Sequence, residues 1–448
     1  MPSKVEVRNA FTTGLALSIA LFLSIVSAAE HPNVVFILSD DQSWEDYGFM
    51  GNEEVRTPHL DQLASQSLLF KKGYVVSPLC RPSLASMVTG LHPHDHGVVG
   101  NDVSPARLME RDAEDQPVRA AFHQNPSLIR FLVEQGYLAH QSGKWWEGSA
   151  KDGGFTHGMT HGDPMKRGRH GDEGLRIGRE GLAPVIKFID LAAEQEKPFL
   201  LWYAPFLPHT PHNPPAEILA RYQDKGLTEG TAKYYAMCEW FDQTCGELVA
   251  AIDERGLREN TLFVYICDNG WLAADDSRIE LPGGWWPSYA PKSKGSPYEL
   301  GVRTPIFFSW RGEIEPEEAN GFASSLDLFP TIVELCGFEA PVGLPGLNLM
   351  KETRDSVRGA AYSIHNMTPG KPFETLQYSW LRKGNWKFLR RHDGIDSTKY
   401  LAVHDWDRVP VQLFDLSQDP EESTNVADHY PEVVSKFQES LSQIFPQP

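Results

Sequence analysis

Cysteine is scarce in this chain, since only five of its 448 residues are cysteine. That number is too small for the disulfide framework that holds many small secreted domains together. Two of the five, Cys238 and Cys245, are seven residues apart in a segment predicted to be helical. This separation is about 10 Å along a helix axis, too far for a bridge within one straight helix. We expect at most one disulfide and no zinc cluster.

Positive charge is also limited. The chain carries 41 Lys and Arg against 60 Asp and Glu, which gives a formal net charge of −19. This argues against a broad nucleic-acid-binding face, which needs an excess of cations, and we expect no nucleic-acid partner. An acidic protein that handles an anion must gather its cations around one pocket. Apolar residues make up 41% of the chain and charged residues 23%, as in a globular protein of roughly two to four domains.

Long apolar runs are almost missing. The one long run spans residues 15–26, follows Lys4 and Arg8, and leads into small residues around Ala28. This order is typical of a secretory signal peptide, here residues 1–28, and the run is too short to cross a membrane comfortably. We therefore expect an exported protein, periplasmic or extracellular, with no stable membrane insertion after cleavage. An uncleaved anchor is the alternative.

Two predicted strands end in acidic or amide side chains. The continuous apolar runs Asn33–Leu38 and Thr261–Cys267 are typical of strands buried on both faces of a parallel sheet. Open α/β sheets bind their ligands at the carboxyl ends of such strands. Four side chains follow the ends of these two runs, and each offers an oxygen atom as a ligand. Oxygen ligands suit Ca²⁺ or Mg²⁺ better than zinc. The four residues are Asp40, Asp41, Asp268 and Asn269. For an Asp-Asp pair alone, a solvated turn is the more frequent structure.

A cysteine begins the segment Cys80–Gly90, and a proline follows two residues later. Pro82 biases Arg81 away from helical geometry, so the sequence predicts a helix over 83–88 with Ser83 as its N-cap. Cys80 would then lie just before a helix N-terminus, where backbone N–H groups favour an anion. Taken alone, such a cysteine is more often a buried residue in a loop-to-helix corner.

This segment closely resembles the signature of the type I sulfatases, which reads Cys-x-Pro-Ser-Arg and closes with Thr-Gly. Three later segments resemble further motifs of that family: Gly143–Gly148, Pro208–Pro211 and Lys294–Pro305. The resemblance extends from about residue 33 to residue 428. It implies an α/β fold with a large, mostly parallel mixed sheet flanked by helices, as in alkaline phosphatase, and a smaller C-terminal α+β subdomain with an antiparallel sheet. We expect the catalytic domain over residues 30–340 and the subdomain over 341–448.

The resemblance also implies a chemistry. In the family the cysteine, here Cys80, is oxidised to formylglycine by a maturation enzyme. A hydroxyl of the hydrated aldehyde attacks sulfur, and the second hydroxyl allows sulfate to be expelled. Lys144 and Lys294 match the lysines that contact the sulfate, and His209 matches the histidine near the leaving group, with His212 as the weaker candidate. The resemblance implies one cation, Ca²⁺ or alternatively Mg²⁺, held by residue 80 and the four strand-end side chains. The expected substrate is a sulfated saccharide.

Two positions depart from the family pattern. Leu84 stands where the family has arginine, and Trp146 stands where it has a histidine that helps to hold the aldehyde. Arg81 lies three residues too early on the predicted helix to replace the missing arginine. Because the arginine is part of what the family's maturation enzyme recognises, we expect Cys80 either to be modified poorly or to be modified by an enzyme that tolerates leucine here.

Three functions are compatible with these motifs. The first is hydrolysis of a sulfate ester. The second is hydrolysis of a phosphodiester or phosphonate monoester by an enzyme of the same superfamily. The third is binding of a sulfated glycan by a catalytically inactive protein with this fold.

The segment from residue 151 to residue 179 is predicted to be a long loop. Its histidines and arginines could attract an anion: His157, His161, Arg167, Arg169 and His170.

Overall fold

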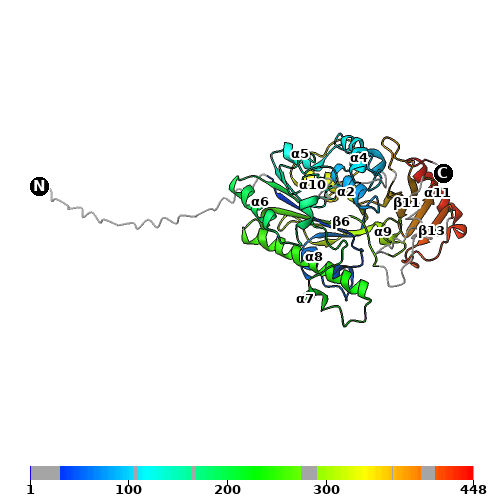
Figure 1. Cartoon of the computed structure of the whole chain (residues 1–448), viewed down its shortest axis with the longest axis horizontal. Coiled ribbons are helices and arrows are strands. Elements are labelled where there is room, and N and C mark those ends of the chain that lie inside the picture. Colours follow the sequence, from blue (N-terminus) through cyan, green and yellow to red (C-terminus); the bar gives the residue numbers. More distant parts are fainter. Residues whose placement is uncertain are drawn as a thin grey trace.

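The computed structural model describes Met1 and residues 31–103, 108–163, 168, 170–273, 290–365, 367–394 and 409–446. Residues 2–30, which hold the predicted signal peptide, lie outside these ranges, as do Arg167 and Arg169. Figure 1 shows a large sheet with helices on both faces and a smaller sheet beside it near the C-terminus. The predicted fold class is confirmed.

Five strands of the large sheet run parallel, in the spatial order β4, β3, β5, β1, β6. Every residue of the four longer ones is buried. The continuous apolar character of β1, β5 and β6 predicts this, whereas β3 is buried although it carries His140, Gln141 and Ser142. Their carboxyl ends lie at the same edge of the sheet, so the residues that follow them are brought together. The strands are β1 (Asn33–Ser39), β3 (Leu138–Gly143), β4 (His157–Gly158), β5 (Phe199–Ala204) and β6 (Thr261–Cys267).

The other side of the sheet is mixed. β7 (Arg303–Ser309) is antiparallel to β6 and to β2 (Leu68–Tyr74). Two short strands, β8 (Glu317–Glu318) and β9 (Ala323–Ser324), pair in parallel with β2. β7 is not among the predicted strands, because it contains Pro305, and proline usually argues against a central strand.

Alternate residues of the central strands enter two separate apolar cores. Val34 and Phe36 of β1 face one core, whereas Val35 and Ile37 face the other. The first core is covered by α2 (Cys80–Thr89), α4 (Leu108–Phe122), α5 (Leu128–Glu134) and α10 (Leu328–Leu335). The second is covered by α1 (Pro58–Ala64), α6 (Ala183–Glu194) and α8 (Glu229–Glu254), on the opposite side of the sheet in Figure 1. The remaining short helices are α3 (Pro93–His96), α7 (Ala216–Leu219) and α9 (Glu299–Val302).

The second sheet has four antiparallel strands, and α11 (Pro431–Ser442) packs on it through Phe437 and Leu441. The sequence pattern predicts a short strand from Trp380 to Phe388, and this prediction is wrong. The chain turns at Gly384, whose φ of 56° suits glycine, and so divides this stretch into a hairpin. The strands are β10 (Ser356–Tyr362), β11 (Leu376–Lys383), β12 (Trp386–Arg391) and β13 (Val411–Asp415). The domain boundary at residue 340 stays a prediction.

Helix α2, which carries Cys80, begins earlier than predicted. It starts at Cys80, and Leu79 rather than Ser83 is its N-cap residue. Pro82 falls in the first turn, where a helix needs no N–H donor, so proline does not delay the start. Cys80 is therefore the first residue of the helix and not the residue before it.

The five cysteines are all buried and unbridged. The prediction of at most one disulfide is therefore confirmed, and Cys238 and Cys245 lie on α8, as expected. Within the described ranges, no helix is both long enough and apolar enough to span a membrane.

Candidate active site

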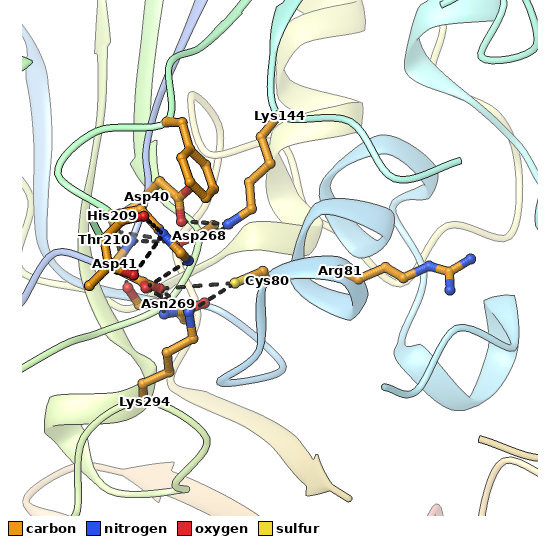
Figure 2. Close-up of polar contacts among 12 residues, drawn as sticks. Asp40, Asp41, Cys80, Arg81, Lys144, His209, Thr210, Asp268, Asn269 and Lys294 are labelled. Carbon is orange, nitrogen blue, oxygen red and sulfur yellow. Dashed lines mark hydrogen bonds and ion pairs between the residues drawn. The ribbon is translucent and has the colours of Figure 1, made fainter. Parts of the chain in front are cut away.

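Four side chains from two strand ends converge beside Cys80 (Figure 2). Asp40 and Asp41 follow β1, and Asp268 and Asn269 follow the neighbouring strand β6. The backbone N–H of Asp41 donates to Asp268 Oδ1 at 3.1 Å, and Asn269 Nδ2 donates to Asp41 Oδ1 at 2.7 Å. Asp41 has a φ of 63°, a left-handed conformation that Asp tolerates better than most residues. The juxtaposition predicted from the strand ends is present.

Two lysines reach this cluster from opposite sides. Lys144 Nζ lies 2.5 Å from Asp40 Oδ1 and 3.1 Å from Asp268 Oδ2. Lys294 Nζ lies 2.5 and 2.6 Å from the two carboxylate oxygens of Asp41, and 3.2 Å from Cys80 Sγ. The structure thus brings both predicted lysines, the predicted nucleophile and the predicted metal ligands to one place.

Gly143 makes the position of Lys144 feasible. Its φ is 85°, and a Cβ at this residue would lie 1.8 Å from the carbonyl oxygen of Ala204 on β5. Only glycine fits this close approach of two backbones. The N–H of Lys144 then donates to the same carbonyl at 2.7 Å, which aims the lysine side chain over the strand ends.

Burial and mutual repulsion shape the ionisation of the cluster. Burial raises the pKa of Asp40, and it raises the pKa of Asp268 to about 7. Burial would also raise the pKa of Asp41, but Lys294 and His209 outweigh it and hold this pKa well below its usual range. Burial raises the pKa of the Cys80 thiol to about 12 despite the two lysines, so the unmodified thiol is a poor nucleophile at neutral pH.

The residues at the strand ends fit a divalent metal of the hard class. Ligand atoms of Asp40, Asp41, Cys80 and Asp268 all lie within 4.8 Å of one another, and two oxygens on one calcium ion can be at most about 5 Å apart. Two buried acceptors, Asp40 Oδ2 and Asn269 Oδ1, have no hydrogen-bond partner among the described residues. An unpaired buried oxygen is costly, and a cation is the natural partner for an acceptor.

His209 lies at the edge of the cluster. Its Nε2 is 3.4 Å from Asp41 Oδ2, and its Nδ1 is 2.7 Å from the carbonyl oxygen of Thr210. Burial lowers the pKa of His209 to about 3, so the imidazole is neutral in this environment. The ring of His212 lies 5.9 Å from that of Trp271, and among the described residues His212 forms no hydrogen bond or ion pair with the four strand-end side chains. Of the two candidate histidines, His209 is the one at the cluster.

Arg179 holds the segment that carries His209, and sequence reasoning missed it. Its guanidinium donates to the carbonyl of Phe206 at 2.8 and 3.1 Å and to that of His209 at 3.0 Å. The Nη1 atom of Arg179 donates to Asn213 Oδ1 at 2.6 Å. A lone arginine in a Gly-rich loop gives no local signal for this role, because the carbonyls lie 27 and 30 residues away in the chain.

The two departures from the family pattern are buried apolar positions. Leu84 is packed in the first core and is 4% exposed. The ring of Trp146 lies 4.4 Å from that of His170, which in turn lies 6.1 Å from Phe206. Of the residues singled out in the long loop, His170 thus lies near the site, while Arg167 and Arg169 are outside the described residues. His157 instead packs against Phe188 on α6.

Arg81 points away from the cluster, as Figure 2 shows, and is committed elsewhere. It is 2% exposed and forms a bidentate pair with Glu147 at 2.7 and 2.8 Å. A second bidentate pair, at 2.6 and 3.0 Å, joins it to Asp115 on α4. The prediction that Arg81 cannot replace the arginine missing at Leu84 is confirmed. The ion pairs tie the first turn of α2 to the loop that follows Lys144.

Breaking this buried pair should destabilise the fold. We expect Glu147→Gln to lower the free energy of unfolding by about 3 kcal/mol, because it leaves part of a buried guanidinium charge unpaired. Glu180→Gln is the matched control, since Glu180 pairs with Arg176 at the exposed surface and such pairs contribute at most about 1 kcal/mol. Denaturant unfolding followed by tryptophan fluorescence measures both. Equal losses for the two variants would contradict a structural role for the buried pair.

Comparison with known proteins agrees with these observations. A family model described as Sulfatase matches residues 32–338. A second, described as N-sulphoglucosamine sulphohydrolase, C-terminal, matches residues 293–447. The matched segments together include every residue of the cluster described above.

Similar proteins match over nearly the whole chain. Human arylsulfatase A is 27% identical, over 95% of this chain and 89% of its own length. An N-acetylgalactosamine-6-O-sulfatase of Bacteroides thetaiotaomicron is 24% identical, over 93% of each chain. The crystal structure of Ps i-CgsB in complex with k-i-k-neocarrahexaose has the same fold, with a TM-score of 0.68, 21% identity and 92% coverage of both chains.

Proposed function

This chain belongs to the type I sulfatase family, and we propose that it releases sulfate from a sulfated carbohydrate with a formylglycine made from Cys80 and a bound divalent metal. As a sulfatase it is a sulfuric ester hydrolase. One observation carries the finer proposal. Three carboxylates, an amide and Cys80 meet at two strand ends, with a lysine on either side.

The charge of the cluster suits an anionic substrate only with a cation present. Once a metal keeps all three carboxylates ionised, they and the two ammonium groups carry a net charge of −1 before the charge of the metal is counted. A divalent metal would bring the site to +1, which attracts a sulfate monoester anion. Asp40, Asp41, Asp268 and Asn269 would hold the metal, and it would supply a Lewis acid that polarises a sulfuryl oxygen. We propose Ca²⁺, with Mg²⁺ as the alternative.

Oxidation of Cys80 would supply a hydrated aldehyde, with one hydroxyl to attack sulfur and a second whose proton loss lets sulfate leave. Around it, Lys144 and Lys294 are placed to bind sulfuryl oxygens, because each ammonium lies beside a carboxylate that the metal would share. Positive charge held there in advance stabilises the charge that develops as the ester bond breaks.

His209 is the proposed proton donor to the leaving oxygen. Its imidazole is neutral in the isolated site, and an incoming sulfate anion would raise its pKa because an added negative charge favours the charged form. Thr210 fixes the ring through its carbonyl, and Arg179 fixes the surrounding segment. His209 can then pass a proton from Nε2 to the departing alkoxide.

The substrate class rests on the relatives. An enzyme similar to this chain over most of its length acts, by its name, on N-acetylgalactosamine 6-O-sulfate, and the protein solved with a neocarrahexaose shares the fold. We therefore propose a sulfated saccharide as substrate and a maturation enzyme as an obligatory partner. The residues that precede His31 are proposed to export the chain.

Aryl esters provide the first test of this function. We expect kcat/KM for 4-nitrophenyl sulfate to exceed that for bis(4-nitrophenyl) phosphate by a factor of about 100 or more. A sulfate monoester offers three terminal oxygens to the proposed metal and the two lysines, whereas a phosphodiester offers two and carries a second ester group. The enzyme should be co-expressed with a formylglycine-generating enzyme, and peptide mass spectrometry should show residue 80 as formylglycine. A preference for the phosphodiester would favour the phosphodiesterase alternative. Intact cysteine in every active sample would exclude the proposed nucleophile.

A panel of defined sulfated saccharides then separates an enzyme from a binding protein. We expect release of inorganic sulfate from at least one of them, measured by ion chromatography. The inactive alternative predicts saccharide affinity without any sulfate release.

A further inference from the structure

A second cavity lies beyond the other end of α2 from Cys80. It has a volume of about 290 Å³ and lies where the loops around α10 meet the start of β10. Its lining includes His92, Ser324, Leu347, Arg354 and Arg358. The ten residues of α2 alone separate it from Cys80 by about 15 Å, so it is distinct from the cluster described above.

The wall of this cavity carries more positive charge than the acidic side chains around it neutralise. Arg354 donates to both oxygens of the buried Asp327, at distances from 2.5 to 2.9 Å, so these two charges cancel. Asp355, the only acidic residue of the lining, pairs with Lys383 at 2.9 Å. Arg358 has no ion-pair or hydrogen-bond partner among the described residues, and its charge is left over.

His92 adds a buried polar atom to the same wall. His92 is only 7% exposed, and its Nδ1 has no hydrogen-bond partner in the described part of the chain. The ring stacks on His94 with 5.2 Å between centroids, which fixes its orientation. Burial, with His94 and the two arginines, lowers the pKa of His92 to about 3, so the ring is neutral and can donate one hydrogen bond without adding charge.

An unpaired guanidinium and a buried, unpartnered imidazole in one cavity are unusual in a chain with a net charge of −19. Guanidinium groups bind sulfate and phosphate type oxyanions through two parallel hydrogen bonds. The cavity is at the small end of the range for small-molecule sites, about 300 to 1,000 Å³, which suits a single oxyanion or one sulfated sugar unit.

We propose that this cavity is a second anion site, in which Arg358 and His92 bind a sulfate-type oxyanion away from the catalytic cluster. The oxyanion is either free inorganic sulfate or the sulfate group of a saccharide. The choice of sulfate over other oxyanions rests on the proposed function, whereas the existence of an anion site does not.

Isothermal titration calorimetry tests the proposal on the full chain, with inorganic sulfate and N-acetylglucosamine 6-sulfate as separate probes. In the wild type we expect a binding event in addition to that at the catalytic cluster. Arg358→Ala should weaken this additional binding at least tenfold, and Arg358→Lys should weaken it less. Arg358 is exposed on β10, so the variants should fold, and circular dichroism checks this. The inhibition constant of sulfate as a product of hydrolysis should not change in Arg358→Ala, because that constant reports the catalytic cluster.

Each outcome decides one point. A tenfold or greater preference for the sulfated sugar, lost in Arg358→Ala, identifies a saccharide sulfate as the ligand. Equal binding of both probes identifies the free oxyanion. Binding that is unchanged in Arg358→Ala, or absent from the wild type apart from the catalytic cluster, overturns the proposal. Loss of hydrolysis activity alone would count against the proposed function and not against this site, since binding is measured directly.

Discussion

Cys80→Ser should convert an enzyme capable of multiple turnovers into one that completes only the first half of a single turnover. The serine hydroxyl can attack the sulfur of a bound ester and release the alcohol, but it lacks the second hydroxyl whose deprotonation expels sulfate. We expect steady-state kcat to fall by a factor of about 10⁴ or more, with at most one equivalent of 4-nitrophenol released per enzyme. Stopped-flow absorbance measures the burst, and intact-protein mass spectrometry should detect the retained sulfo group.

Two further variants make this result specific to residue 80. Cys80→Ala should give no burst, because it has no hydroxyl, while the lysines and carboxylates around it remain. Cys245→Ser replaces a buried free cysteine on α8, outside the cluster, and should turn over substrate. Sustained turnover by Cys80→Ser would show that formylglycine chemistry is not required, and the proposed mechanism would then fail.

The strand ends were the part of the site that the sequence could predict. A buried parallel strand is a continuous apolar run, and the predicted runs Asn33–Leu38 and Thr261–Cys267 have nearly the observed bounds. Since these two strands are parallel neighbours, the side chains that follow them must be close together. The positions of Lys144 and Lys294 came instead from the family resemblance, because nothing in their local sequence distinguishes them from surface lysines.

Other features depend on contacts that no local pattern encodes. The buried pair of Arg81 with Glu147 joins residues 66 positions apart, and the cavity at His92 is closed by a segment more than 230 residues later. The hairpin at Gly384, by contrast, has a local signal that was overlooked, because Gly384-Asn385 between Lys383 and Trp386 is typical of a two-residue hairpin turn. The start of α2 was misplaced because proline both disfavours the preceding residue and is well tolerated in a first helical turn.

Asp41→Asn should be the most damaging change among the proposed metal ligands. Asp41 is 1% exposed and contacts Lys294, Asn269 and His209, so one charge is shared by three partners. Neutralising it removes a metal ligand and leaves the ammonium of Lys294 without its main counter-charge. We expect kcat/KM to fall by a factor of about 10³ or more. Calorimetric titration of chelator-treated protein with CaCl₂ should show calcium affinity at least about 100-fold weaker.

Asp46→Asn is the matched control for this prediction. Asp46 is also buried, at 5% exposure, and lies five residues along the chain, but it accepts a hydrogen bond from Tyr234 and not from a lysine. Burial raises its pKa to about 7, so about half of its side chains are already neutral at that pH and replacement by an amide changes little charge. Calcium affinity and kcat/KM should stay close to wild type. If both variants lost calcium equally, burial of a carboxylate near β1 would explain the effect, and Asp41 would not be a ligand.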